Sequence, residues 1–238
     1  MQALKASGVC RRYAKQEVLR DFSLELEAGA FEALMGPSGS GKSTFLHLAA
    51  GLLSADAGEV VVGGRDVVKM GDAEATKFRR RHIGVVFQSF NLLNEKSVRE
   101  TIVLPLRLDG AKVDESRLAS LVAALGIGGV LRKRPEELSG GEQQRVAIAR
   151  ALVAEPEVIL ADEPTGSLDA KASRAICALL GDLHKTEKSA ILVVTHDPQV
   201  AAAARKVHFL KDGKIAASHE TLGDPERVSR LYLETYSS

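Results

Sequence analysis

A glycine-rich run at residues 36–43, Gly-Pro-Ser-Gly-Ser-Gly-Lys-Ser, contains the residue types that bind phosphate. The glycines at positions 36, 39 and 41 let the backbone adopt conformations that a Cβ would obstruct, so that successive N–H groups can point inward around an anion. Lys42 can reach the β and γ phosphates of a nucleoside triphosphate, and the Ser43 hydroxyl can ligate Mg²⁺. The run therefore predicts a nucleotide-binding loop.

Two acidic residues, Asp162 and Glu163, follow the apolar run Val-Ile-Leu-Ala at 158–161. An isolated Asp-Glu pair is usually a solvated turn. Here the pair ends a predicted buried strand in a chain that also has a phosphate-binding loop, which favours a catalytic role. We expect Asp162 to hold Mg²⁺ through a water, and Glu163 to polarise the attacking water as general base.

Two further polar residues, Gln88 and His196, each follow an apolar run that is typical of a strand. Gln88 could contact Mg²⁺ and the attacking water, and His196 could hydrogen-bond to the γ-phosphate and position that water. An ordinary loop glutamine and a structural histidine are the alternatives, and we interpret the other five histidines as structural. With Lys42 and Glu163, these two residues make up the predicted catalytic set.

A second motif, Leu-Ser-Gly-Gly-Glu-Gln-Gln at 138–144, places small residues before a predicted helix at 141–154. Small residues let the N-terminus of a helix approach an anion, so that its N–H groups and dipole can bind phosphate. The chain thus has two phosphate-binding motifs but one acidic strand end. The simplest arrangement is a head-to-tail dimer with twofold symmetry, in which each copy contributes one half of each site.

Tyr13 lies in the early strand region, where it could stack on an adenine ring or simply be exposed at a strand edge. The basic runs at 79–81 and 132–134 contain no interleaved aromatic residues, and only 4% of the chain is aromatic. We therefore interpret both runs as solvated faces and expect no nucleic acid to bind by base stacking.

The glycine-rich loop has the flanking elements that it requires. Residues 31–35 form a predicted strand, and after the loop the apolar residues Phe45, Leu48, Ala49 and Leu52 fall on one helix face. The runs at 158–161 and 191–195 are typical of central parallel strands covered on both faces. Other predicted strands lie at 22–26, 59–62, 83–87, 207–210 and 215–217, the last two joined by an Asp-Gly turn, and other predicted helices at 116–125, 170–185 and 223–238.

Composition restricts the class of protein. The 238 residues have a net charge of +1, with 45% hydrophobic and 26% charged residues, which fits a globular protein with no general affinity for polyanions. The only cysteines, Cys10 and Cys177, indicate neither a disulfide framework nor a zinc site, so we expect a reducing compartment. No apolar run approaches the roughly 18–20 residues that span a bilayer, and no leader is evident. We expect a cytosolic protein that does any membrane work through a partner.

With these motifs in this order, the chain resembles the nucleotide-binding subunit of an ABC (ATP-binding cassette) transporter over nearly all of residues 1–225. The resemblance also covers a D-loop, Ser167-Leu168-Asp169, and implies that ATP and Mg²⁺ are the ligands. The nucleotide-contacting residues that it implies are Tyr13, Gly36, Pro37, Ser38, Gly39, Ser40, Gly41, Lys42, Ser43, Thr44, Ser139, Gly140, Gly141 and Glu142. The metal-contacting residues that it implies are Ser43, Gln88 and Asp162.

The same resemblance implies the fold: an α/β cassette of the P-loop NTPase type in one domain over 1–238. Its expected parts are a RecA-like core, an antiparallel β subdomain, and an inserted α-helical subdomain at approximately 89–157. ATP would close a homodimer formed head to tail around the nucleotide. That motion would drive integral membrane permease subunits docked near Gln88 and residues 89–106, and the chain would be peripheral on the inner face of the cell membrane.

A finer resemblance links the chain to the branch that drives lipoprotein release and macrolide or peptide efflux. It rests on Phe-Asn-Leu-Leu at 90–93, Leu-Pro-Leu at 104–106 and Pro-Thr-Gly-Ser-Leu-Asp at 164–169. The chain departs from that branch at 94–98, where Asn-Glu-Lys-Ser-Val stands in place of the usual proline and Leu-Thr-Val stretch. The alternatives are an importer ATPase, a cell-division regulator of the same branch, and an ABC ATPase without transport. The transported cargo does not contact this subunit.

Overall fold

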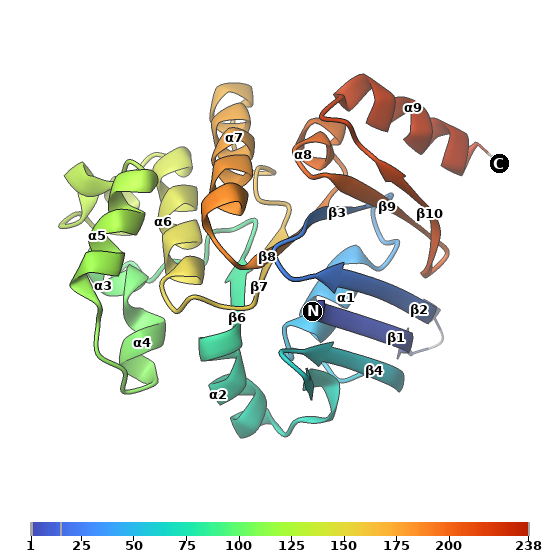
Figure 1. The fold of residues 1–238 in the computed structure, drawn as a ribbon, viewed down its shortest axis with the longest axis horizontal. Coiled ribbons are helices and arrows are strands. Elements are labelled where there is room, and N and C mark those ends of the chain that lie inside the picture. The colour runs from blue at the N-terminus through green and yellow to red at the C-terminus, as the bar shows by residue number, and fades with distance from the viewer. Residues whose placement is uncertain (1, 15, 238) are drawn as a thin grey trace.

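The computed structural model describes residues 2–14 and 16–237. A six-stranded sheet with the order β10-β9-β3-β8-β7-β6 forms its centre (Figure 1). All neighbours in this sheet pair in parallel except the β9–β10 hairpin, which turns through Asp212 and Gly213 at positive φ. Its strands are β3 (Phe31–Met35), β6 (Ile83–Val86), β7 (Val158–Asp162), β8 (Ala190–Thr195), β9 (Lys206–Lys211) and β10 (Lys214–Glu220).

A four-stranded antiparallel sheet with the order β2-β1-β4-β5 lies beside the first. Its strands are β1 (Gln2–Tyr13), β2 (Gln16–Glu27), β4 (Ala57–Val62) and β5 (Arg65–Asp66). Helix α1 (Lys42–Ala49) shares a buried cluster with both sheets, in which Phe45 packs on Phe22 with ring centroids 4.3 Å apart. The nucleotide-binding loop is therefore anchored in the core.

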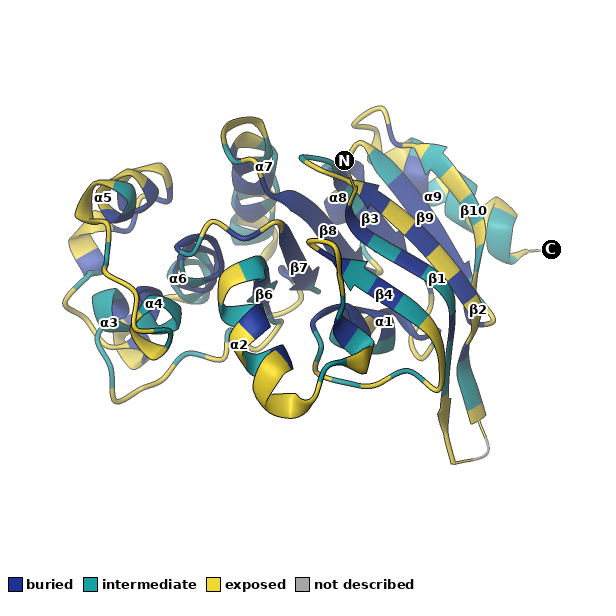
Figure 2. Ribbon diagram, turned by 60° about the horizontal axis from the view of Figure 1, so that its bottom comes forward, coloured by how far each residue is buried: buried dark blue, intermediate teal, exposed yellow. Residues whose placement is uncertain are grey.

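The six-stranded sheet is buried on both faces. In β8, Leu192 and Val194 join the cluster around α1, whereas Ile191 and Val193 join a second cluster with the helices on the other face. Figure 2 shows these central strands as mostly buried, while α2 (Asp72–His82) and the loops carry much of the exposed surface. The prediction of covered parallel strands at 158–161 and 191–195 is confirmed.

Most of the remaining helices lie on the side away from the antiparallel sheet (Figure 1). That group comprises α3 (Val98–Ile102), α4 (Leu104–Leu108), α5 (Glu115–Ala124) and α6 (Gly140–Leu152). Helices α7 (Ala170–Thr186), α8 (Pro198–Ala202) and α9 (Pro225–Tyr236) cover the central sheet, and short 3-10 turns occur at Val67–Lys69, Gly128–Val130 and Pro135–Glu137. Within the described residues, no helix is both long enough and apolar enough to cross a bilayer.

The predicted helices at 116–125, 141–154, 170–185 and 223–238 are confirmed to within a few residues. Sequence reasoning missed α2, because only Ala75 and Phe78 are buried in it and its three consecutive arginines obscure that short apolar pattern. The prediction of a solvated face at 79–81 is wrong for two of its three residues. Arg79 donates to the carbonyls of Ala50 and Gly51, and Arg80 donates to that of Leu108.

Candidate nucleotide-binding and active site

The glycine-rich loop joins β3 to α1, and its two ends, at Gly36 and Gly41, are closely packed, whereas residues 37–39 are exposed. Gly39 and Gly41 have φ of 78° and 107°, a region in which a side chain is strained. A Cβ added to Gly41 would lie 2.9 Å from the carbonyl oxygen of Val18, in the antiparallel sheet. The loop can therefore keep this shape only with glycine, and the shape is one that can cradle an anion.

Lys42 is buried and points into the loop. Its Nζ donates to the carbonyl oxygens of Gly36 and Pro37 at 2.8 and 2.9 Å. Burial lowers the pKa of the Lys42 ammonium, while the charges of Glu163 and Asp162 oppose that shift. A cation held here next to a backbone cradle fits the phosphates of a nucleotide.

Ser43 and Asp162 meet across 119 residues of sequence, since the Ser43 hydroxyl donates to Asp162 Oδ1 at 3.0 Å. Burial raises the pKa of Asp162, and the hydrogen bond from Ser43 opposes this. The described residues contain no cluster of three or more His, Cys, Asp or Glu side chains that could hold a metal by itself. One hydroxyl and one carboxylate nevertheless suit Mg²⁺, which takes most of its other ligands from water and substrate phosphates.

Glu163 directly follows β7, and its carboxylate contacts two residues at the end of β8. The Thr195 hydroxyl donates to Oε2 at 3.0 Å, and Nδ1 of His196 lies 2.7 Å from Oε1. Glu163 itself has a φ of 44°, and its N–H donates to the carbonyl of Val194. Two of the four predicted catalytic residues are thus in contact. Thr195 was missed, although its hydroxyl directly precedes the predicted histidine.

Gln88 lies against the segment that follows Glu163. A Cβ added to Gly166 would lie 2.8 Å from Gln88 Nε2, and the Ser167 hydroxyl donates to the Gln88 carbonyl at 3.2 Å. The structure therefore brings Gln88 to the D-loop identified in the sequence.

The second motif forms the N-terminus of α6, where Ser139 and Glu142 make a reciprocal capping box. Ser139 N and Oγ both donate to Glu142 Oε2 at 2.8 Å, and Glu142 N donates to Ser139 Oγ at 3.4 Å. Hydrogen bonds from the backbone and then the side chain of Ser139 lower the pKa of Glu142. No hydrogen bond or ion pair between described residues joins this motif to residues 36–44 of the same chain.

Tyr13 is exposed at the end of β1, with the Arg11 guanidinium 5.0 Å from its ring centroid. The next strand, β2, carries the Val18 that abuts Gly41, so Tyr13 belongs to the sheet that borders the loop. Both interpretations of this residue, adenine stacking and an exposed edge, are compatible with its position.

Tyr236 supports the loop from the far end of the sequence. Its hydroxyl donates to the Leu210 carbonyl at 2.7 Å, and a Cβ added to Gly36 would lie 3.2 Å from that hydroxyl. Burial raises the pKa of Tyr236. No signal in the sequence could have linked two residues 200 positions apart.

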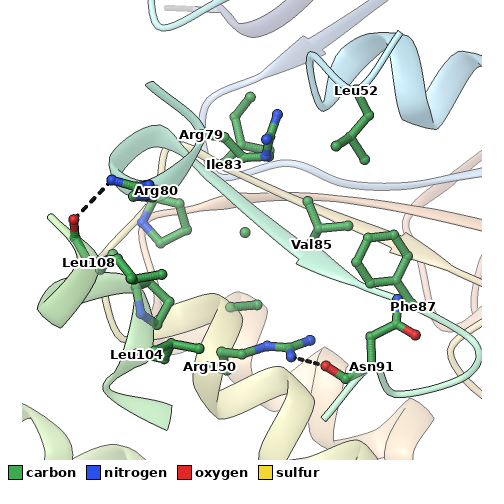
Figure 3. Close-up of a pocket in the computed structure, with 15 residues that line it drawn as sticks. Leu52, Arg79, Arg80, Ile83, Val85, Phe87, Asn91, Leu104, Leu108 and Arg150 are labelled. Carbon is green, nitrogen blue, oxygen red and sulfur yellow. Dashed lines mark hydrogen bonds between the residues drawn. The ribbon is translucent and has the colours of Figure 1, made fainter. Parts of the chain in front are cut away.

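A cavity of about 360 Å³ opens beside β6, between α2, α4 and α6 (Figure 3). Much of its lining is apolar, and the guanidinium groups of Arg79, Arg80 and Arg150 surround it. The apolar side chains that line it include Leu52, Ile83, Val85, Phe87, Leu104 and Leu108. Leu52 and Leu108 are exposed, so the surface continues to solvent.

Comparison with known families gives a match over residues 19–166 to the model described as ABC transporter. The ABC transporter ATP-binding protein YxdL of Bacillus subtilis (strain 168) is 42% identical over 201 residues, which are 84% of this chain and 78% of that protein. The bacitracin export ATP-binding protein BceA of Halalkalibacterium halodurans is 37% identical over 221 residues, covering 90% and 87%.

Solved structures agree with this match. The dimeric structure of the bacterial ABC transporter cassette MJ0796 superposes with a TM-score of 0.82 at 37% identity, over 92% of this chain and 98% of that chain. A post-hydrolysis state of the same cassette, bound to ADP and Pi, gives a TM-score of 0.81 at 36% identity with the same coverage.

Proposed function

Because this chain belongs to the ABC transporter family, as an ATP-binding and ATP-hydrolysing subunit, we propose that the residues gathered around Glu163 and Lys42 form its catalytic site. The fold expected from the resemblance, an ABC cassette of the P-loop NTPase type, is confirmed by these matches. ATP is its nucleotide and Mg²⁺ its metal, as in the rest of the family.

The observation that carries the proposal is that Thr195 and His196 both hydrogen-bond to the Glu163 carboxylate. A carboxylate fixed in this way, close to the phosphate-binding loop, can accept a proton from water that attacks the γ-phosphate. His196 would orient that water, and Lys42 would offset the charge that develops on the transferred phosphoryl group. Ser43 and Asp162 would hold Mg²⁺, with Gln88 as a further contact implied by the family resemblance, and the metal would supply positive charge against the β and γ phosphates.

The second half of each site would come from another copy of the chain. Ser139, Gly140, Gly141 and Glu142 form a capped helix N-terminus, which is suited to phosphate, yet among the described residues no hydrogen bond or ion pair joins them to the loop of their own chain. A related cassette, 37% identical, is a dimer in its solved structure. These observations support a homodimer arranged head to tail around ATP, with the nucleotide between the loop of one copy and α6 of the other.

The cavity beside β6 is the proposed docking site for permease subunits. It includes Asn91, Leu104 and Pro105 from the segment 89–106, for which the family resemblance implies partner contacts (Figure 3). Its apolar lining, which continues to the exposed Leu52 and Leu108, fits an apolar helix segment of the partner. This docking would make the chain a peripheral protein on the cytoplasmic face of the membrane.

An export-type role is favoured over the importer and cell-division alternatives by the name of one relative, the bacitracin export ATP-binding protein. Within export systems, the motifs at 90–93, 104–106 and 164–169 support the lipoprotein-release and macrolide-export branch. In that branch the dimer moves the extracytoplasmic parts of its membrane partner.

A substitution of the proposed base tests the catalytic assignment. We expect Glu163→Gln to lower ATP turnover by roughly 100-fold or more, as is usual for loss of a general base, while ATP still binds and dimers accumulate. Turnover is measured by phosphate release, and dimers by size-exclusion chromatography with ATP.

The matched control is Glu157→Gln, at the other end of β7. Glu157 also pairs with a histidine, since its Oε2 lies 2.9 Å from His82 Nδ1. We expect this variant to keep wild-type turnover. A Glu163→Gln variant that hydrolyses ATP at the wild-type rate would contradict the role of Glu163.

A further inference from the structure

The segment that follows Gln88 has an unusual backbone. Phe90 and Asn91 are consecutive non-glycine residues with φ of 60° and 50°, in the left-handed region. This conformation is unfavourable for residues with a side chain, above all for a bulky one such as phenylalanine. It persists only where the surroundings hold it.

Arg150 provides such a hold. Its guanidinium, near the C-terminal end of α6, donates to the Asn91 carbonyl at 2.5 Å (Figure 3). It also donates to the Phe90 carbonyl at 3.0 Å. Burial lowers the pKa of Arg150. Across residues 2–14 and 16–237, no carboxylate lies within ion-pair distance of this side chain. A desolvated cation without an acidic partner is costly unless dipoles compensate it, and these two carbonyls are the acceptors that it has.

The same segment also lies against the start of α6. A Cβ added to Gly140 would lie 3.8 Å from Phe90 Cζ and 3.1 Å from Leu168 Cδ2. The Gln88 carbonyl accepts a hydrogen bond from Ser167. Residues 88–91 thus lie beside the N-terminal end of α6 and are hydrogen-bonded to Arg150 near its C-terminal end and to the D-loop.

We propose that Arg150 is a positioning residue for Gln88: it fastens the strained turn at Phe90 and Asn91 to α6, so that Gln88 moves together with the helix whose N-terminus is Ser139. This inference rests on the proposed function, in which Gln88 acts in hydrolysis and α6 binds the nucleotide of the other copy. Arg150 also lines the cavity beside β6, so a partner bound there would contact the side chain that holds the turn.

A purely structural role for Arg150 is the competing explanation, and Arg145 offers a matched control. Arg145 belongs to the same helix and also donates to a backbone carbonyl, that of Leu125 at 2.9 Å. That carbonyl follows α5 and is remote in sequence from residues 88–91. Arg145→Met therefore removes a comparable contact of α6 without releasing the turn.

The experiment is a double-mutant cycle on the ATPase activity of the full chain, with Arg150→Met, Gln88→Ala and the double variant. We expect Arg150→Met to lower kcat on the order of tenfold, as for directly coupled residues, with KM for ATP changed by less than about twofold. In the Gln88→Ala background, Arg150→Met should lower kcat by less than about twofold, because the residue that it positions is already gone. Arg145→Met should keep kcat within about twofold of the wild type.

Three results would overturn the inference. The first is a loss of kcat in the double variant equal to the product of the losses in the two single variants. The second is a loss of kcat in Arg145→Met as large as that in Arg150→Met. The third is an Arg150→Met variant in which only KM for ATP changes. If Arg150→Met does not fold by circular dichroism, Arg150→Lys takes its place under the same criteria, since lysine keeps the charge but cannot donate from a rigid fork to both carbonyls. A Gln88→Ala variant with wild-type kcat would contradict both the proposed function of Gln88 and this inference, whereas multiplying effects contradict the inference alone.

Discussion

The two phosphate-binding motifs of this chain differ in how far their own chain completes them. The loop at 36–43 lies between the two sheets, with Lys42 buried and with Asp162 at hydrogen-bond distance from Ser43. The motif at 138–142 caps a helix in the group away from the antiparallel sheet, and its polar contacts are mainly within its own capping box (Figure 1). The loop at 36–43 therefore has most of its contacts within its own chain. The motif at 138–142 is preorganised but needs a second copy of the chain to form a site.

This contrast predicts a different effect for each half on ATP binding by the isolated chain. We expect Lys42→Ala to weaken ATP binding by tenfold or more, roughly the value of a hydrogen bond to a charged group. The dissociation constant is measured by calorimetry at a protein concentration where the chain is monomeric. An unchanged dissociation constant would contradict the claim that the loop at 36–43 binds ATP without a second copy of the chain.

Ser139→Ala is expected to have a smaller effect, and on different quantities. Loss of an N-cap should lower the free energy of unfolding by about 1 kcal/mol. ATPase activity should fall roughly tenfold, because the phosphate-facing end of α6 acts in the dimer. Monomeric ATP binding should stay within about twofold of the wild type, since α6 then contacts no nucleotide.

Asp114→Ala is the control for this prediction. Asp114 caps α5 by accepting hydrogen bonds from Ser116 N and Arg117 N, so its loss should cost about the same stability. It should leave ATPase activity unchanged. Equal losses of activity in Ser139→Ala and Asp114→Ala would reduce the role of Ser139 to helix capping.

The smallest effect concerns the charge at Glu142. Because its pKa is lowered in the folded state, the ionised carboxylate adds stability above the unfolded pKa of about 4.3, and this is lost as pH falls through the folded pKa. The difference in unfolding free energy between the wild type and Glu142→Gln should therefore be constant from about pH 7 to about pH 5 and shrink below that. Urea unfolding at several pH values measures it. A difference that grows on acidification would contradict this account of the capping box.

The parts that could be predicted from sequence are those with local signals. The loop stands directly between a strand and a helix, and the Asp162-Glu163 pair directly follows an apolar strand. The neighbouring residues in the sequence are therefore enough to recognise each motif. The capping box is also local, since Ser139 and Glu142 are three residues apart.

The remaining features depend on the tertiary fold. Tyr236 reaches the base of the loop, and Arg150 reaches Phe90 across 60 residues, because parallel strands and their crossover helices bring distant segments together. Arg79 and Arg80 look solvated in sequence but hold helix-end carbonyls, since a long side chain can bury its stem and still donate.

The central claim is that the two motifs meet across two copies of the chain, and a cross-link between them tests it most directly. Ser38→Cys and Ser139→Cys are introduced together with Glu163→Gln, after Cys10 and Cys177 are replaced by serine, and a short bis-maleimide is added. The account predicts a covalent dimer with ATP and Mg²⁺ and none with ADP. A cross-link within one chain, or a dimer yield that does not depend on ATP, would contradict it.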